Sequence, residues 1–162
     1  MLATVRKSML TYTMAVTGSP VQFGVWLMAL WFTSNGPAAY LTCTSMLFDP
    51  TTPCTTQVFG FIPVTVNLWH TLCHLSTGLI GLVLVVRRPG AIFYALFFGA
   101  YYLAWGLLGL FFTEQVRHAL GVDIFGSWVH VAEGLILFAI WIGDRLTAQS
   151  HNTNHHVGTA AI

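Results

Sequence analysis

Charged side chains are scarce in this chain. Of its 162 residues only 7% are charged and 56% are hydrophobic, and six Lys or Arg against five Asp or Glu leave a net charge of +1. Soluble domains carry about 25% charged residues, so a soluble fold is excluded. So small a net charge also leaves no basic surface for nucleic acid. With a mean hydropathy of +0.72, the chain is predicted to be an integral membrane protein in a lipid bilayer.

The signatures of several enzyme classes are also missing. The chain has no glycine-rich phosphate loop and no nucleophile elbow, so we expect neither nucleotide hydrolysis nor acyl transfer. Thr71 follows His70 where a zinc-protease motif requires Glu. These absences argue against a hydrolase and leave other enzymatic activity undecided.

Long stretches with little charge define the expected membrane spans. A helix crosses a bilayer with about 20 residues, and the stretches of suitable length are 14–35, 62–86, 91–113 and 120–142. We therefore expect an all-α fold, an integral membrane four-helix bundle over residues 1–143 with a polar cytoplasmic tail at 144–162. Gly-Ser-Pro at 18–20 and Asn-Gly-Pro at 35–37 interrupt the first span. Residues 38–48 then form either a short interfacial helix or a continuation beyond a kink.

The distribution of Lys and Arg predicts the orientation. Five of these six residues lie before the first span, between the second and third spans, or after the fourth, which places both termini in the cytoplasm. The 36–61 connection then lies outside. It contains Cys43 and Cys54, and their spacing leaves open whether they form a disulfide. Three histidines in the last stretch fit a solvated tail better than a metal-binding tract: His151, His155 and His156.

An internal repeat relates the second and fourth expected spans. Residues 67–80 align without a gap with residues 123–136, which pairs His74 with His130 and places a glycine one turn after each. The repeat predicts two similar transmembrane hairpins, with these two histidines at the same depth. The glycines leave room either for a bulky group or for the close approach of another helix.

Four ionisable side chains in these spans form the candidate site. Such groups are costly inside a membrane and usually mark function. His70 and His74 are one helical turn apart, as are His130 and Glu133, so the four side chains can converge. Further polar side chains on the same faces and on the third span are expected to surround them: Asn67, Asp123, Ser127 and Tyr102.

Three interpretations of this site remain open. A tetrapyrrole, haem b or chlorophyll, would take its axial ligands from His74 and His130, with His70 as a further candidate. A bare metal ion would be bound by the three histidines and Glu133, the nitrogen and oxygen donors that zinc, iron and copper accept. Alternatively, the histidines only hydrogen-bond to neighbouring groups and hold the helices together.

The polar pattern of these spans resembles a bacterial membrane family, the domain of unknown function DUF4383. The matching pattern is Asn-x-x-His-x-x-x-His-x-x-x-Gly in the second span, a Tyr- and Gly-rich third span, and an Asp followed by a His in the fourth. The matching residues are Asn67, His70, His74, Gly78, Tyr102, Gly106, Gly109, Asp123 and His130. The resemblance implies a four-span protein of a bacterial inner membrane or thylakoid membrane, and it implies no activity.

The expected function is that of a small accessory subunit within a larger respiratory or photosynthetic membrane complex. So small and aromatic-rich a chain has little surface outside the membrane with which to act alone. One rival is a membrane haem b protein that carries electrons to quinone. Another is a membrane protein that binds a metal ion through His and Glu side chains.

Overall fold

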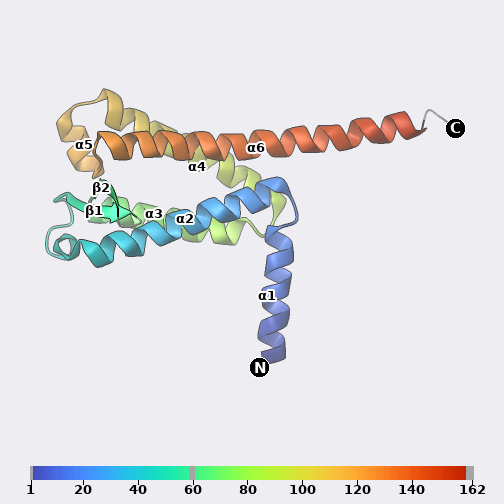
Figure 1. Ribbon diagram of the computed structural model, residues 1–162, viewed down its shortest axis with the longest axis horizontal. Coiled ribbons are helices and arrows are strands. Elements are labelled where there is room, and N and C mark those ends of the chain that lie inside the picture. Colours follow the sequence, from blue (N-terminus) through green and yellow to red (C-terminus); the bar gives the residue numbers. More distant parts are fainter. Residues whose placement is uncertain (1, 59–60, 160–162) are drawn as a thin grey trace.

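The computed structural model describes residues 2–58 and 61–159, and this part of the chain is mostly helical. Figure 1 shows α2 and α3 running side by side, α4 and α6 forming a second pair, and α1 projecting from one end. The elements, in chain order, are α1 (Leu2–Val16), α2 (Pro20–Thr42), a 3-10 turn η1 (Thr44–Leu47), β1 (Cys54–Val58), β2 (Ile62–Val66), α3 (Leu68–Leu84), α4 (Arg88–Phe111), α5 (Glu114–Leu120) and α6 (Ile124–Thr159).

The expectation of helices that are long and apolar enough to cross a membrane is confirmed, and that of four spans is confirmed only in part. Within the described residues, α4 and α6 are long and apolar enough to cross a membrane, and α1 with α2 adds a third span if the bent pair counts as one. α3 has 17 residues. At about 1.5 Å per residue it is shorter than the roughly 30 Å hydrocarbon core. The helical content is therefore as predicted, and a four-helix transmembrane bundle is not confirmed.

Only the first of the two expected interruptions breaks the helix. α1 ends at Val16, and α2 begins at Pro20, where Ser19 caps it by accepting a hydrogen bond from the backbone N–H of Gln22. At the second, α2 continues through Pro37 to Thr42. For residues 38–42 the structure therefore adopts the continuation of the helix and not a separate interfacial helix.

Glycines bring the helices of each pair into close contact. A Cβ built on Gly78 of α3 would lie 2.8 Å from the Cα of Thr33 in α2, and one on Gly134 of α6 would lie 2.7 Å from the carbonyl oxygen of Gly99 in α4. Any larger side chain there would push the backbones apart. Of the two uses predicted for these glycines, the structure shows the close approach of another helix.

Aromatic rings fill the core between the two pairs. Tyr94 and Tyr102 of α4 and Phe32 of α2 are its largest fully buried side chains. The rings of Phe32 and Tyr102 stack with their centroids 4.4 Å apart. The aromatic third span therefore packs helices together, and Tyr102 lies at the edge of the histidine site.

A two-stranded hairpin covers the end of the molecule opposite α1. Residues 62–66, expected to begin the second span, form β2 instead and pair antiparallel with β1. Their sequence, Ile-Pro-Val-Thr-Val, is rich in β-branched residues, which favour strands. Cys43 and Cys54 form a disulfide that ties β1 to the end of α2, and the backbone N–H of Thr65 donates to Asp123 at 3.0 Å.

Beyond residue 142, where the fourth span was expected to end, α6 continues without a break to Thr159. Its side chains are described as far as residue 150. The tail histidines His151, His155 and His156 lie outside the described side chains.

Candidate metal centre

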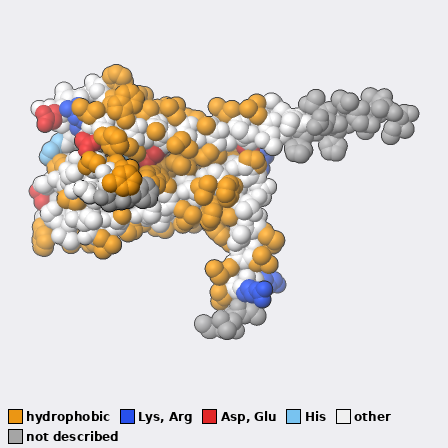
Figure 2. All heavy atoms as spheres, in the orientation of Figure 1, with side chains coloured by type: hydrophobic (Ala, Val, Ile, Leu, Met, Phe, Trp, Pro, Cys, Tyr) orange, Lys and Arg blue, Asp and Glu red, His pale blue; other side chains and the backbone are white. Residues whose placement is uncertain are grey.

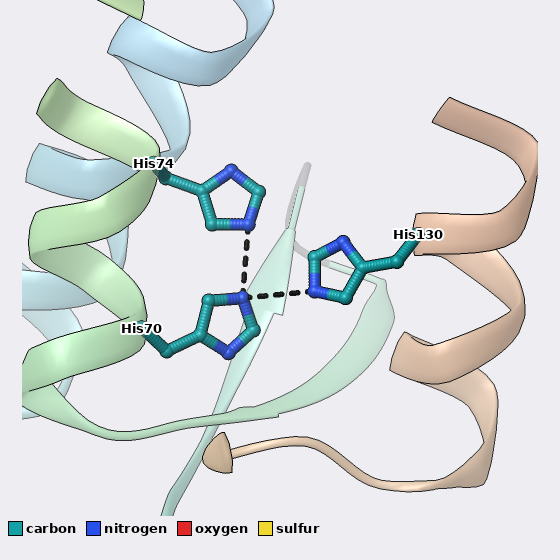
Figure 3. Close-up of side chains that lie close together, drawn as sticks. All are labelled: His70, His74 and His130. Carbon is teal, nitrogen blue, oxygen red and sulfur yellow. Dashed lines mark hydrogen bonds between the residues drawn. The ribbon is translucent and has the colours of Figure 1, made fainter. Parts of the chain in front are cut away.

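Three histidines from two helices meet in the interior of the protein, near its hairpin end. His70 and His74 point from successive turns of α3 toward His130 of α6 (Figure 3). The Nε2 atom of His70 lies 2.9 Å from Nε2 of His74 and 3.2 Å from Nε2 of His130. All three residues are at most 7% exposed. One ring nitrogen from each histidine thus faces a shared point in the protein interior.

The first turns of α3 and α6 aim these histidines in the same way. Asn67 caps α3 by accepting the N–H of His70 at 2.9 Å, and Asp123 accepts the N–H of Gly126 at 2.6 Å at the start of α6. His74 and His130 each follow their cap by seven residues. Seven residues make almost two helical turns, so each histidine lies on the same face of its helix as its cap. The two segments of the repeat therefore have matching local structures.

Hydrogen bonds on the outer side of two rings define their protonation. Nδ1 of His70 lies 2.6 Å from the carbonyl oxygen of Gly121, which can only accept, so Nδ1 carries the proton. Nδ1 of His130 lies 2.7 Å from Oε2 of Glu133, and this nitrogen carries the proton when the carboxylate is ionised. In a neutral imidazole, a proton on Nδ1 leaves Nε2 as a bare lone pair. With Glu133 ionised, His70 and His130 then turn lone pairs toward each other across 3.2 Å.

Two lone pairs at this distance repel unless a cation or a proton lies near them. His74 offers one N–H at most when it is neutral, and its Nε2 lies 2.9 Å from that of His70. That single proton satisfies one of the two contacts and not the other. Among the described residues, Nδ1 of His74 is buried without a hydrogen-bond partner. With three neutral rings and Glu133 ionised, one of the two contacts at Nε2 of His70 thus lacks a proton.

Glu133 supports the cluster from outside. Its second oxygen, Oε1, accepts a hydrogen bond from Nε1 of Trp31 at 2.7 Å. The ligand atoms that lie within 4.8 Å of one another come from His70, His74 and His130, and Glu133 is not among them. Of the four ligands considered for a metal ion, the structure therefore brings three nitrogens together and places the carboxylate behind His130.

The remaining residues expected around the site take different roles. The Tyr102 ring packs against His74 and His130, and its hydroxyl lies 2.6 Å from that of Thr77. Asn67 and Asp123 are helix caps, as described above. Ser127 donates a hydrogen bond back to the carbonyl of Asp123 in its own helix and reaches none of the histidines.

Two residues that contact the histidine site or Glu133 were not predicted from the sequence. Gly121 ends α5 with φ at +64°, a conformation that favours glycine, and its carbonyl thereby reaches His70. A Cβ there would also lie 2.5 Å from the side chain of Asn67. Trp31 is far from Glu133 in sequence. For Gly121 the sequence held one signal, because a glycine that follows a helix with basic residues such as Arg117 and His118 in its last turn is a common helix ending.

A cavity of about 110 Å³ adjoins the histidines. It is lined by all three of them and by residues of α2, the hairpin and α6, including Ala39, Val64 and Val129. Because a cavity needs only about 10–15 Å³ of such space to hold one water, it has room for water and other small ligands beside the histidines.

The comparisons with known proteins identify the family. Neither a curated protein nor a solved structure matches the chain. Residues 22–142, well over half of the chain, match a domain of unknown function, DUF4383. That range contains His70, His74, His130 and Glu133, and it confirms the resemblance seen in the sequence. The chain therefore belongs to the DUF4383 family.

Proposed function

We propose that this protein binds a divalent transition-metal ion inside the membrane through the Nε2 atoms of His70, His74 and His130. The observation that carries the proposal is the set of three converging nitrogens, with Nδ1 of His70 and Nδ1 of His130 each hydrogen-bonded on the outer side of its ring. Metal-binding histidines almost always donate their other N–H to a carbonyl or carboxylate. Gly121 and Glu133 supply one of each.

The distances suit such an ion. Zinc–nitrogen bonds of about 2.0–2.1 Å at a tetrahedral centre place two ligand nitrogens roughly 3.3–3.4 Å apart. Two of the three separations between these nitrogens, 2.9 and 3.2 Å, are close to this value, and all three nitrogens lie within 4.8 Å of one another. Imidazole ligands also suit iron, copper and nickel, so the donor set supports this class of ion and not one member of it.

A purely structural role explains the cluster less well. The histidines do connect α3 to α6, as the hydrogen-bonding interpretation expects. To remove the repulsion between the lone pairs of His70 and His130, however, one ring would need an additional proton and a positive charge. Glu133 would balance that charge, but the single lone pair on Nε2 of His70 would then face two N–H donors, whereas a bound cation is a common partner for all three nitrogens.

A tetrapyrrole is also less well supported. Two imidazoles that ligate one haem lie on opposite faces of the macrocycle. Here the rings of His74 and His130 are 5.3 Å apart and inclined by 28°, and both direct Nε2 toward a third imidazole, His70 (Figure 3).

Three protein ligands leave a coordination position for a further ligand. Structural zinc sites are closed by four protein ligands, while catalytic sites keep one position open. The adjoining cavity supports a small ligand at that position, so a reactive centre is favoured over a structural one. An accessory role in a larger membrane complex stays a prediction, and the proteins that copurify with this chain would test it.

Metal analysis of the full-length protein tests the proposal. Protein purified in mild detergent should contain close to one equivalent of a transition metal, and His70→Ala or His130→Ala should lose it. His118→Ala is the matched control, because His118 is exposed on α5. A Soret band between 350 and 750 nm would instead support a haem. A colourless parent that neither contains nor takes up Zn²⁺ or Co²⁺ would overturn metal binding.

A further inference from the structure

Helix α1 leaves the rest of the molecule at a fixed, steep angle. It is bent by 113° relative to α2 (Figure 1). The hydroxyl of Tyr12 donates to the carbonyl of Leu82 at 3.1 Å, and Nε2 of Gln22 donates to that of Ala15 at 2.8 Å. Val16 is 2% exposed in the core. With α4 and α6 crossing the membrane, a helix held at this angle runs close to the membrane plane.

The residues of α1 are arranged for such a position. Val5, Met9, Tyr12 and Val16 form one stripe along the helix. Tyr12 and Val16 at its inner end pack against the core, whereas Val5 and Met9 are 49% and 67% exposed. The exposed part of the stripe therefore faces the same side as the membrane-crossing helices.

A polar face lies away from this stripe. Helical spacing places Thr4, Lys7 and Thr11 together on it. Leu10 and Met14, 60% and 59% exposed, lie on the same side as Lys7. An exposed apolar stripe on a helix that also carries Lys and Arg is typical of segments that lie in a membrane interface.

The charges of the whole molecule support the same position. Five of the six Lys and Arg lie at this end, and the one acid among them, Asp144, is 2% exposed and paired with Arg88 at 2.6 Å. Figure 2 shows basic side chains on the projecting helix, with the exposed hydrophobic ones. At the hairpin end Arg117 is accompanied by three acids, Asp49, Glu114 and Asp123.

We infer that α1 lies in the bilayer interface, with Val5 and Met9 among the acyl chains and with Arg6 and Lys7 in contact with the phosphate groups of anionic lipids. The partner of these exposed side chains of α1 is thus the lipid surface itself. The inference does not depend on the metal site, which lies at the other end of α3.

Spin labels test the placement in the full-length protein. In a Cys73→Ala background, single cysteines at Val5 and Met9 report the apolar stripe, and those at Thr4 and Thr11 report the polar face. In reconstituted vesicles the first pair should collide several-fold more with oxygen, relative to a water-soluble nickel chelate, than the second pair. Equal access of all four labels to nickel would overturn the inference, because α1 would then lie in water. Dipolar broadening between labels would also overturn it, since a second copy would then cover the stripe.

The charge contribution needs a second comparison. Adding phosphatidylglycerol to phosphatidylcholine vesicles should move the Met9 label deeper in the parent and in Arg117→Gln, the control at the opposite end. The double variant Arg6→Gln/Lys7→Gln should lose this response and keep its oxygen access. An anionic lipid that leaves the parent unchanged would overturn the assignment of anionic headgroups.

Discussion

His130 and Glu133 lie one turn apart on α6, with Nδ1 of the histidine 2.7 Å from Oε2 of the carboxylate. The other oxygen accepts from Trp31 on α2. The carboxylate thus orients the ring, and it increases the basicity of the nitrogen that faces the other histidines. Glu133 lies behind the ring and not beside the three nitrogens, so we expect it to tune metal binding and not to be a ligand itself.

Glu133→Gln should weaken metal binding without abolishing it. The amide oxygen can still accept from His130, while the negative charge is lost and the amide N–H₂ cannot accept from Trp31. Loss of such outer partners typically lowers metal affinity about 10–100-fold, which competition with a chelator would measure. Glu114→Gln, exposed at the start of α5, is the matched control. An affinity unchanged by Glu133→Gln would contradict this role.

Gly121→Ala should destabilise the fold near the site. Its φ of +64° is strained for alanine, and the new Cβ would lie 2.5 Å from the side chain of Asn67. We expect a loss of about 1–3 kcal/mol in the free energy of unfolding, seen as a lower melting temperature in detergent, together with weaker metal binding. Gly143→Ala, where nothing lies within 4 Å, should not destabilise the protein. Equal melting temperatures for the two variants would refute the close fit of Gly121.

Gly134→Ala should separate α4 from α6. The added Cβ would meet the carbonyl oxygen of Gly99 and the amide nitrogen of Leu103, each at 2.7 Å. Backbone atoms cannot move aside as a flexible side chain can, so we expect about 1–3 kcal/mol of destabilisation from overpacking. Thermal unfolding would measure it. Because His130 is one turn away on the same helix, metal content should fall as well, and normal metal content would show that the helix spacing is not critical for the site.

Cys54→Ser should make the metal site more accessible. The disulfide to Cys43 holds β1 against the end of α2, and both the hairpin and α2 line the cavity beside the histidines. Without it, the hairpin should open more often. A chelator should then remove the metal faster, with the same three nitrogens still present. Cys73→Ser, at the free cysteine of α3, provides the control. Identical release rates would show that the hairpin does not limit access.

Much of the candidate site could be predicted because the chain is so poor in polar groups. A buried histidine in an apolar segment stands out, and helical spacing alone places His70 and His74 on one face. That these would meet His130 followed from the repeat. The role of Glu133 did not follow, since helical spacing places it near His130 equally well as a ligand or as an outer partner.

Other features required contacts between distant parts of the chain. Residues 62–66 read as the start of an apolar span, and they become a strand because residues 54–58 pair with them. The disulfide was an open alternative until the fold brought Cys43 and Cys54 together, with their Cα atoms 6.0 Å apart. Pro37 was expected to interrupt the helix, yet α2 continues through it to Thr42.

The sequence by itself determined the apolar helical character, the family and the histidines of the candidate site, because hydrophobicity and helical periodicity are local properties of a chain. Only the tertiary structure decided which nitrogen of each ring faces the others, that Gly121 and Trp31 support the site, and that α1 turns away from the bundle. Those properties depend on hydrogen bonds and contacts between residues tens of positions apart, which no local pattern contains.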